Sequence, residues 1–217
     1  QRVSPTEPLA GLIAHDWGGA VAWNTANQHP EAMRRLMVIN SPHPGTFLRE
    51  LQSNPAQQAA SAYMNFLIRP DAEALLSEDD FRRLWEFFTN MGAIDGPHPW
   101  LTDTFKDQYR AVWKQGLTGP LNYYRASPMR PAREGDAAVA SLQLPQSMLT
   151  ISVPTCVIWG MQDIALPAGL INGLNTFVPK LTLHRIEDGT HWVVHEQPLR
   201  VAGLLENYLR DTKVESP

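Results

Sequence analysis

Residues 9–29 combine a short apolar run, a tight turn and a helix-like stretch, with a single carboxylate at the turn. Residues 9–15 are mostly apolar and follow a proline, which predicts a buried strand. Residues 18–29 predict a helix that ends before Pro30. Asp16 lies between the two. A strand, a turn and a helix in this order form a nucleophile elbow, which holds a reactive side chain at the tip of the turn.

Asp16 stands where the better-known form of this turn carries a serine, and the exchange changes the reactions that are possible. A serine that attacked a saturated carbon would form an ether, which water does not cleave. An aspartate forms an ester, and activated water can open it at the enzyme's own carbonyl group. A carboxylate is also ionised at neutral pH without a base. Asp16 therefore predicts an epoxide or an alkyl halide as target; the alternative is that it only caps the following helix.

The composition is that of an ordinary globular protein, with 217 residues of which 43% are hydrophobic and 18% are charged. The net charge of −4 and the lack of a long charged run argue against a nucleic acid or an anionic membrane as partner. No apolar stretch approaches the length that spans a membrane. Cys156 is the single cysteine, and its apolar surroundings favour a buried structural thiol. We expect no cofactor, no metal ion and a cytoplasmic protein.

Three further apolar runs predict the other strands of a sheet, at residues 35–39, 153–160 and 181–186. Residues 167–177 predict a helix, and Pro198 fits the first turn of the last helix. Strands that alternate with helices indicate an α/β protein with a parallel sheet.

A helical insertion interrupts this alternation. From about residue 46 to 125 the sequence is rich in aromatic residues, is divided by prolines and carries no strand pattern. Phe105, Tyr109 and Trp113 are spaced so that they share one face of a helix. Residues 127–145 hold three prolines and predict a linker that returns to the sheet.

Two later turns carry the residue types that would complete a site around Asp16. Asp163 follows the predicted strand 153–160, and His191 follows the strand 181–186. An open α/β sheet gathers its site at the carboxyl ends of its strands. His191 would act as the general base that deprotonates water, because histidine titrates near neutral pH. Asp163 would orient the ring and stabilise its charged form.

The backbone N–H of Trp17 would supply one donor of an oxyanion hole, since Trp17 follows the nucleophile directly. Taken singly, Asp163 fits a turn residue better, and His191 fits a structural or surface histidine. The catalytic interpretation rests on the order Asp16, Asp163, His191, which is that of hydrolase triads, and on the strand end before each of them.

These motifs resemble those of the α/β-hydrolase superfamily, and specifically of its epoxide hydrolase branch. The resemblance rests on His-Asp-Trp-Gly-Gly at 15–19, Asn-Ser-Pro-His-Pro at 40–44, Trp-Gly-Met-Gln-Asp at 159–163 and Gly-Thr-His-Trp at 189–192. It covers nearly the whole chain. It implies an α/β-hydrolase fold, in which a partial parallel sheet has helices on both faces and an inserted all-helical cap covers the site.

The resemblance also implies that the chain is divided into three parts. Residues 1–44 would form the nucleophile-elbow part of the hydrolase core, residues 45–148 the helical cap with its return linker, and residues 149–217 the part with the acid and the histidine. The family's earlier strands are absent, as is its His-Gly-x-Pro turn, which supplies the second oxyanion donor. Such a segment would hold on the order of 80 residues. We expect an incomplete sequence; the alternative is an inactive relative that acts as a binding protein.

Two tyrosines of the insertion are implicated by the same resemblance. In this family, two cap tyrosines hydrogen-bond the epoxide oxygen and protonate it as the ring opens. Tyr63 lies in a segment similar to that of the first, and Tyr124 precedes Arg125 as the second does, which selects it over Tyr123. A phenol can supply a proton to a leaving alkoxide at neutral pH. The alternative is that both are core aromatics.

The resemblance thus implies an epoxide hydrolase that forms a vicinal diol through an ester on Asp16, with a small apolar epoxide and water as substrates. Trp17, His43 and Trp192 are candidate substrate contacts, although packing explains each of them as well. The alternative is a haloalkane dehalogenase of the same fold, because the Trp17 indole could hold a halide; the paired tyrosines argue against it. A serine esterase is disfavoured, since the chain has no Gly-x-Ser-x-Gly. No oligomeric state is predicted.

Overall fold

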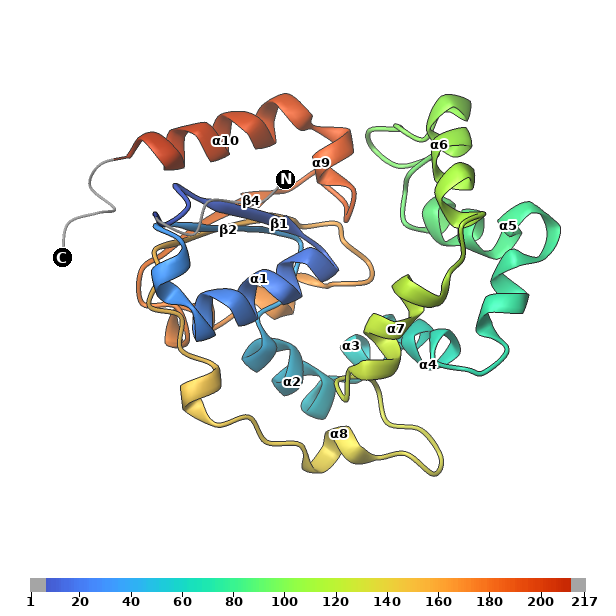
Figure 1. The fold of residues 1–217 in the computed structure, drawn as a ribbon, viewed down its shortest axis with the longest axis horizontal. Helices are drawn as coiled ribbons and strands as arrows, with labels where there is room; N and C mark the ends of the chain where they lie inside the picture. The colour runs from blue at the N-terminus through green and yellow to red at the C-terminus, as the bar shows by residue number, and fades with distance from the viewer. Residues whose placement is uncertain (1–6, 212–217) are drawn as a thin grey trace.

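Four short parallel strands form the sheet of the computed structural model, which describes residues 7–211. They are β1 (Leu12–His15), β2 (Leu36–Ile39), β3 (Thr155–Gly160) and β4 (Leu181–Ile186), and they lie side by side in chain order. His15 pairs with Ile39, and Ile39 pairs with Ile158. The strands therefore end at one common edge of the sheet (Figure 1).

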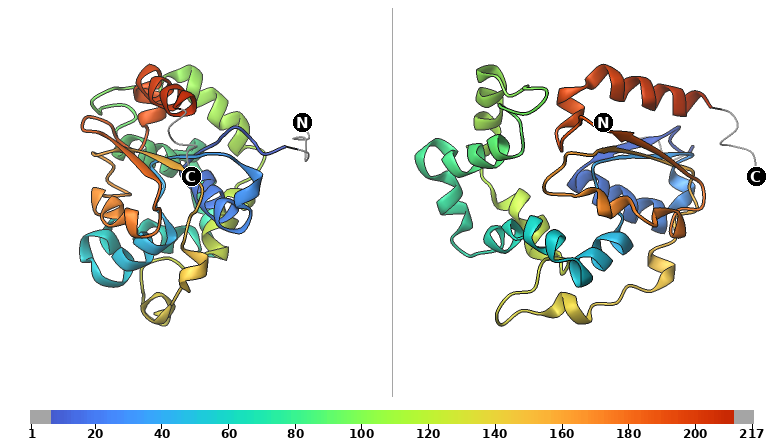
Figure 2. Two further views of the ribbon diagram at one scale, coloured as in Figure 1. Left: turned by 90° about the vertical axis from the view of Figure 1, so that its left-hand side faces the viewer. Right: turned by 180° about the vertical axis from the view of Figure 1, so that it is seen from behind.

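Helices cover both faces of the sheet, as the sequence predicts. Helix α1 (Trp17–Gln28) lies on one face, and α9 (Val193–Glu196) and α10 (Pro198–Arg210) lie on the side of the other (Figures 1 and 2). Because both faces are covered, β2 and β3 are buried along their whole length and consist almost entirely of apolar residues.

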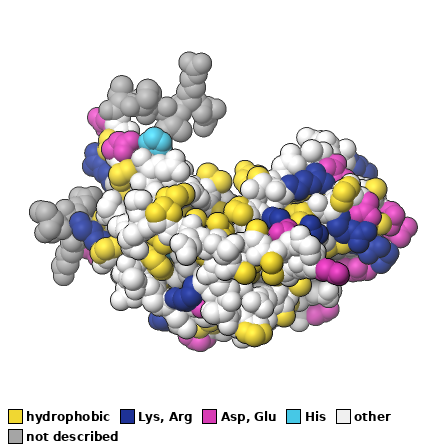
Figure 3. All heavy atoms as spheres, turned by 90° about the horizontal axis from the view of Figure 1, so that it is seen from below, with side chains coloured by type: hydrophobic (Ala, Val, Ile, Leu, Met, Phe, Trp, Pro, Cys, Tyr) yellow, Lys and Arg dark blue, Asp and Glu magenta, His cyan; other side chains and the backbone are white. Residues whose placement is uncertain are grey.

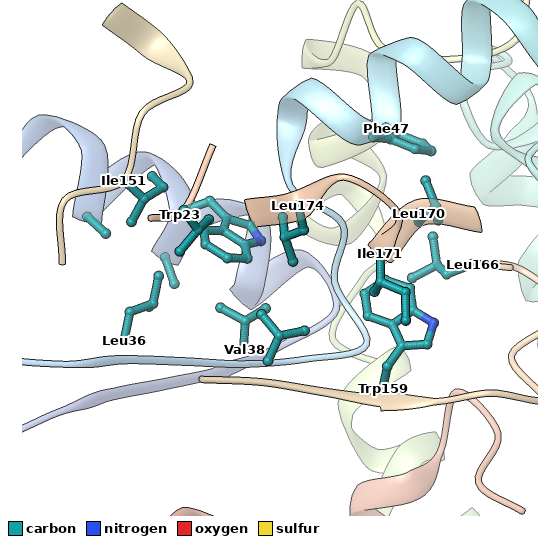
Figure 4. Close-up of a cluster of buried hydrophobic side chains, with 14 of the residues drawn as sticks. Trp23, Leu36, Val38, Phe47, Ile151, Trp159, Leu166, Leu170, Ile171 and Leu174 are labelled. Atoms are coloured by element: carbon teal, nitrogen blue, oxygen red, sulfur yellow. The ribbon is translucent and has the colours of Figure 1, made fainter. Parts of the chain in front are cut away.

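The alternating side chains of the strands divide the core into two clusters. Leu36 and Val38 pack with Trp23 of α1 in the larger cluster (Figure 4). Met37 and Cys156 belong to the second cluster, which includes residues of α10. Cys156 is fully buried, as predicted, and burial raises the pKa of its thiol to about 12.

The described chain between β2 and β3 is built from helices and loops. The helices are α2 (Pro44–Ser53), α3 (Pro55–Ala60), α4 (Tyr63–Leu67), α5 (Ala72–Asn90), α6 (Asp103–Trp113), α7 (Thr118–Ala126) and α8 (Ala138–Ser141). The region from α4 to α7 lies beyond the carboxyl ends of the strands (Figure 1). Tyr109 and Trp113, on the predicted face of α6, both contact Phe88 of α5.

Charged side chains of both signs gather at the end of the molecule that carries α5 (Figure 3). No helix within residues 7–211 is both long and apolar enough to cross a bilayer.

Two local expectations are wrong. Residues 167–177 form two 3-10 turns, Ala168–Ile171 and Leu174–Thr176, instead of one helix. Gly173 between them has a φ of 70°, a left-handed conformation that interrupts a helix. The first strand begins at Leu12, and Leu9 only forms an isolated bridge. The segment 127–145, predicted as a returning linker, connects α7 to the part of the chain before β3 and includes the short helix α8.

Candidate active site

The turn between β1 and α1 is a strained elbow. Asp16 has a φ of 50° and a ψ of −127°, and its side chain makes no hydrogen bond that caps α1. Asp16 thus stands at the N-cap position of α1, but its side chain does not cap the helix. The turn packs closely against the loop after β2. A Cβ atom added to Gly19 would lie only 2.3 Å from the Cβ atom of Ser41. Only glycine permits this approach, and the elbow presents the Asp16 carboxylate beyond the end of β1.

The structure brings Asp16, Asp163 and His191 together. Nδ1 of His191 lies 2.8 Å from Oδ2 of Asp163, and Nε2 of the same ring lies 3.4 Å from Oδ1 of Asp16. The Asp163 carboxylate is buried, and its Oδ1 accepts hydrogen bonds from the backbone N–H groups of Ala165 and Leu166, each at 2.9 Å. The Asp16 side chain instead keeps 41% of its surface accessible. Neither these residues nor any other group of three or more His, Cys, Asp or Glu within residues 7–211 is arranged to hold a metal ion.

Burial and neighbouring charges shift the pKa values of His191 and Asp16 in opposite directions. Burial disfavours the imidazolium form of His191, but the charges of Asp163 and Asp16 and their hydrogen bonds outweigh it and raise the pKa of His191 to about 10. Burial also disfavours the Asp16 anion, but the hydrogen bond and charge of His191 outweigh it, so the pKa of Asp16 is lowered. The Trp17 N–H acts on Asp16 in the same direction. At neutral pH an anionic Asp16 therefore faces a cationic His191.

Tyr63 of α4 and Tyr124 of α7 approach Asp16 from the helical segment. Their ring centroids are 6.1 Å apart, and both residues line the cavities that reach Asp16. Burial raises the pKa of both tyrosines, and the negative charge of Asp16 adds to the effect. Both phenols therefore stay protonated at neutral pH and can donate hydrogen bonds.

Two cavities meet at Asp16, Tyr63 and Tyr124. The first has a volume of about 220 Å³ and is lined mainly by apolar side chains of the helical segment, together with Trp192. The second has a volume of about 180 Å³ and lies against Trp17 and the loop that follows β2. The carboxylate and the two phenols therefore stand at a junction that a substrate can reach with a substituent on either side.

Of the three predicted substrate contacts, Trp17 and Trp192 line cavities, whereas His43 lines neither of these two. His43 is 1% exposed, its Nδ1 accepts a hydrogen bond from the N–H of Gly45 at 3.1 Å, and its ring stacks on Phe177. The expectation for His43 is wrong, because the loop after β2 turns directly into α2 and carries the ring into the core.

Two further residues contact the triad, and neither is predicted from the sequence. Nδ2 of Asn40 donates a hydrogen bond to Oδ2 of Asp163 at 2.8 Å. Nε2 of His15 lies 2.9 Å from the carbonyl oxygen of His191. Burial, together with the charge of His191, lowers the pKa of His15 to about 4, so the ring is neutral and its Nε2–H donates to this carbonyl. Each is a polar residue at the end of a predicted strand, and this is the signal that could have identified both.

Known proteins are similar to this chain in sequence and in architecture. The family described as alpha/beta hydrolase fold matches residues 4–198. The chain is 34% identical to the AB hydrolase superfamily protein YfhM of Bacillus subtilis, over 95% of this chain and 68% of that protein. It is 32% identical to epoxide hydrolase 4 of Mus musculus, over 92% of this chain and 54% of that protein. The crystal structure of a Bacillus megaterium epoxide hydrolase with an inhibitor has a TM-score of 0.82 at 29% identity, over 93% of this chain and 69% of that one.

The chain thus spans about two thirds of the Bacillus subtilis protein and about half of the mouse protein. The matched residues include all four strands, the elbow and the helical segment between β2 and β3. Fold and sequence agree with the resemblance that the motifs carry. The chain belongs to the α/β-hydrolase family and, within it, to the epoxide hydrolase branch.

Proposed function

We propose that this chain carries the active site of an epoxide hydrolase, which converts a small apolar epoxide and water into a vicinal diol. The observation that carries the proposal is the meeting of one anionic carboxylate, Asp16, with two protonated phenols, Tyr63 and Tyr124, at one cavity junction. An epoxide needs both functions, because its carbon must be attacked while its oxygen receives a proton. The relatives named as epoxide hydrolases support the same reaction.

In the first step, an oxygen of Asp16 attacks one ring carbon, and the bond from that carbon to the epoxide oxygen breaks. An ester forms on Asp16, and the freed oxygen takes a proton from Tyr63 or Tyr124. The phenolate is reprotonated at the expense of the His191 imidazolium, which leaves that ring neutral. Ester formation favours this transfer, because it removes the Asp16 charge that stabilises the imidazolium.

In the second step, neutral His191 takes a proton from water, and the resulting hydroxide attacks the carbonyl carbon of the ester. Asp163 stabilises the imidazolium that forms. The backbone N–H of Trp17 donates to the developing oxyanion. The bond between the acyl carbon and the alkyl oxygen then breaks, and that oxygen takes the acid proton of Asp16. The diol leaves, and Asp16 and His191 return to their initial charges.

The alternatives are a haloalkane dehalogenase and a binding protein without activity. A leaving halide requires N–H donors and no proton, and the Trp17 indole could be one such donor. In this structure the Trp17 ring meets the ring of Tyr124 edge to face, with the two centroids 5.1 Å apart. The tyrosine pair favours the epoxide. Halide release from short haloalkanes, with no diol from styrene oxide, would reverse this ranking.

The test is to trap the ester in the complete protein with styrene oxide as substrate. Asp16→Asn should abolish turnover, and His191→Gln should stop after the first step because water is no longer activated. Intact-protein mass spectrometry should then show a mass increase of one epoxide on His191→Gln and none when Asp16→Asn is added. Asp71→Asn, a change in a surface carboxylate paired with Arg69, is the control and should turn over as the wild type does. Turnover by Asp16→Asn at the wild-type rate would rule out the ester mechanism.

A further inference from the structure

Asn40 directly follows β2 and is completely buried beside the end of β3. Its N–H donates to the carbonyl oxygen of Ile158 at 3.0 Å, which continues the hydrogen bonding between the two strands. Its φ is 38°, a left-handed conformation that asparagine adopts more readily than most residues. A buried polar side chain on a strained backbone persists only where its surroundings hold it in place.

The side-chain amide of Asn40 connects the end of β3 with the acid. Its Oδ1 accepts a hydrogen bond from the N–H of Gly160 at 2.9 Å, and its Nδ2 donates to Oδ2 of Asp163 at 2.8 Å. The same Oδ2 meets Nδ1 of His191 at 2.8 Å. Asn40 and His191 therefore share one oxygen of the acid, while two backbone N–H groups hold the other oxygen.

We propose that Asn40 is a positioning residue for the acid and the histidine: its amide fixes the rotation of the Asp163 carboxylate, so that Oδ2 stays in line with Nδ1 of His191. Asn40 lines neither of the two cavities at Asp16, so it acts through Asp163 and not on the substrate. Its effect on turnover rests on the proposed function. Its effect on the His191 ring exists in the resting protein as well.

Asn40→Gly tests the amide alone, because glycine keeps the left-handed backbone without strain. The carboxylate of Asp163 would then keep its two backbone donors at Oδ1 but only His191 at Oδ2, so its rotation would be less constrained. We expect kcat to fall roughly ten- to a hundred-fold, as the loss of a hydrogen bond to a charged group implies, with little change in KM. The NMR signal of the His191 Nδ1 proton should broaden or shift upfield.

Asn40→Asp tests the charge at the same place. Two carboxyl groups at this distance share one proton. While that proton is held, the new carboxyl group donates it to Asp163 and replaces the amide; once it is lost, the two carboxylates repel each other. The ratio of variant to wild-type kcat should therefore fall as the pH rises. The other titratable groups that face the pair are His191, His15, Asp16, Tyr63 and Tyr124, and they are the same in both proteins.

The control is Asn27→Gly, which removes side-chain hydrogen bonds to the carbonyl oxygens of Ser147 and Thr150 near the C-terminal end of α1. It should lower the Tm without moving the His191 signal or the pH profile. The proposal is overturned if Asn40→Gly matches this control in both kcat and the His191 signal, or if the Asn40→Asp ratio does not depend on pH. Should the wild type hydrolyse no epoxide, the proposed function fails, while the His191 signal still decides the role of Asn40.

Discussion

The two carboxylates that flank His191 differ in what the proposed reaction does to them. Asp163 is held by four hydrogen bonds and keeps its charge throughout. Asp16 loses its charge when the ester forms and regains it when the diol leaves. The same ring is therefore an imidazolium before the first step and a base before the second, without any movement of the backbone.

Asp16→Asn imitates the charge of the ester, because an amide is neutral and similar in shape to a carboxylate. It should lower the pKa of His191 from about 10 toward the ordinary histidine value of 6.5, while Asp163 prevents a complete return. An NMR titration of the His191 ring measures this shift. Asp71→Asn, at the surface, should leave the titration unchanged; an equal effect of both variants would contradict the ion pair.

The meeting of Asp16, Asp163 and His191 was predictable because all three occur in the order of a hydrolase triad and each closely follows a strand. Asn40 was not, although it also follows a strand. An asparagine there is an ordinary loop residue until the fold brings it within 2.8 Å of a carboxylate 123 positions later. His43 is the opposite case: it was a candidate substrate contact and lies in the core instead. Nothing in the sequence shows that its loop directs the ring inward.

Helices and strands were predictable from the sequence where a single hydrophobic pattern runs through the whole element. Apolar runs identify β2 and β3, because both of their faces are buried. The region 167–177 is apolar as well, but Gly173 divides it, and the burial of Leu170 and Ile171 comes from the packing of two short turns and not from a helical face. Turn geometry of this kind depends on neighbours that only the fold supplies.

The two glycines at the start of α1 allow a test of the elbow. A Cβ atom on Gly19 would lie 2.3 Å from Ser41 Cβ and 3.2 Å from Val38 Cγ1, whereas one on Gly18 meets nothing within 4 Å. Gly19→Ala should cost about 1–3 kcal/mol of unfolding free energy and lower kcat, because the overpacked helix must move and Asp16 moves with it. Gly18→Ala should stabilise the protein by up to about 1 kcal/mol through its helix propensity. Urea unfolding checks both, and equal effects would show that the elbow is not tight.

At the scale of the whole molecule, the site exists only where two parts of the chain meet. The sheet supplies Asp16, Asp163 and His191 at its carboxyl edge, and the helical segment supplies Tyr63 and Tyr124. The parallel α/β architecture was predictable from the order of apolar runs. The cavity volumes were not, because they depend on how the side chains of α5 and α7 pack. The domain limits at residues 44 and 148 and the cytoplasmic location stay predictions.

The whole molecule should lose stability as the pH falls from about 6.5 to 4. Burial lowers the pKa of His43 to about 4, and burial with the charge of His191 does the same for His15. In this range the unfolded chain binds protons that the folded chain excludes, so acid favours unfolding. His43, which is 1% exposed, contributes up to about 3 kcal/mol of this loss. Asp16, whose pKa is lowered from 3.8, loses its contribution only at still lower pH.

His43→Asn isolates this contribution, because an asparagine can accept the hydrogen bond from Gly45 and does not titrate. The difference in unfolding free energy between pH 7 and pH 4.5, measured with urea, should be smaller in the variant than in the wild type. His29→Asn is the matched control, since the His29 side chain is 63% exposed and its replacement should leave the difference unchanged. The comparison uses only the difference in unfolding free energy between the two pH values. Any loss of stability from poorer packing in His43→Asn is the same at both pH values and therefore cancels. If His43→Asn loses as much stability in acid as the wild type, the His43 ring is not the source of the acid sensitivity, and His15 and His195, whose pKa values burial also lowers, are left to account for it.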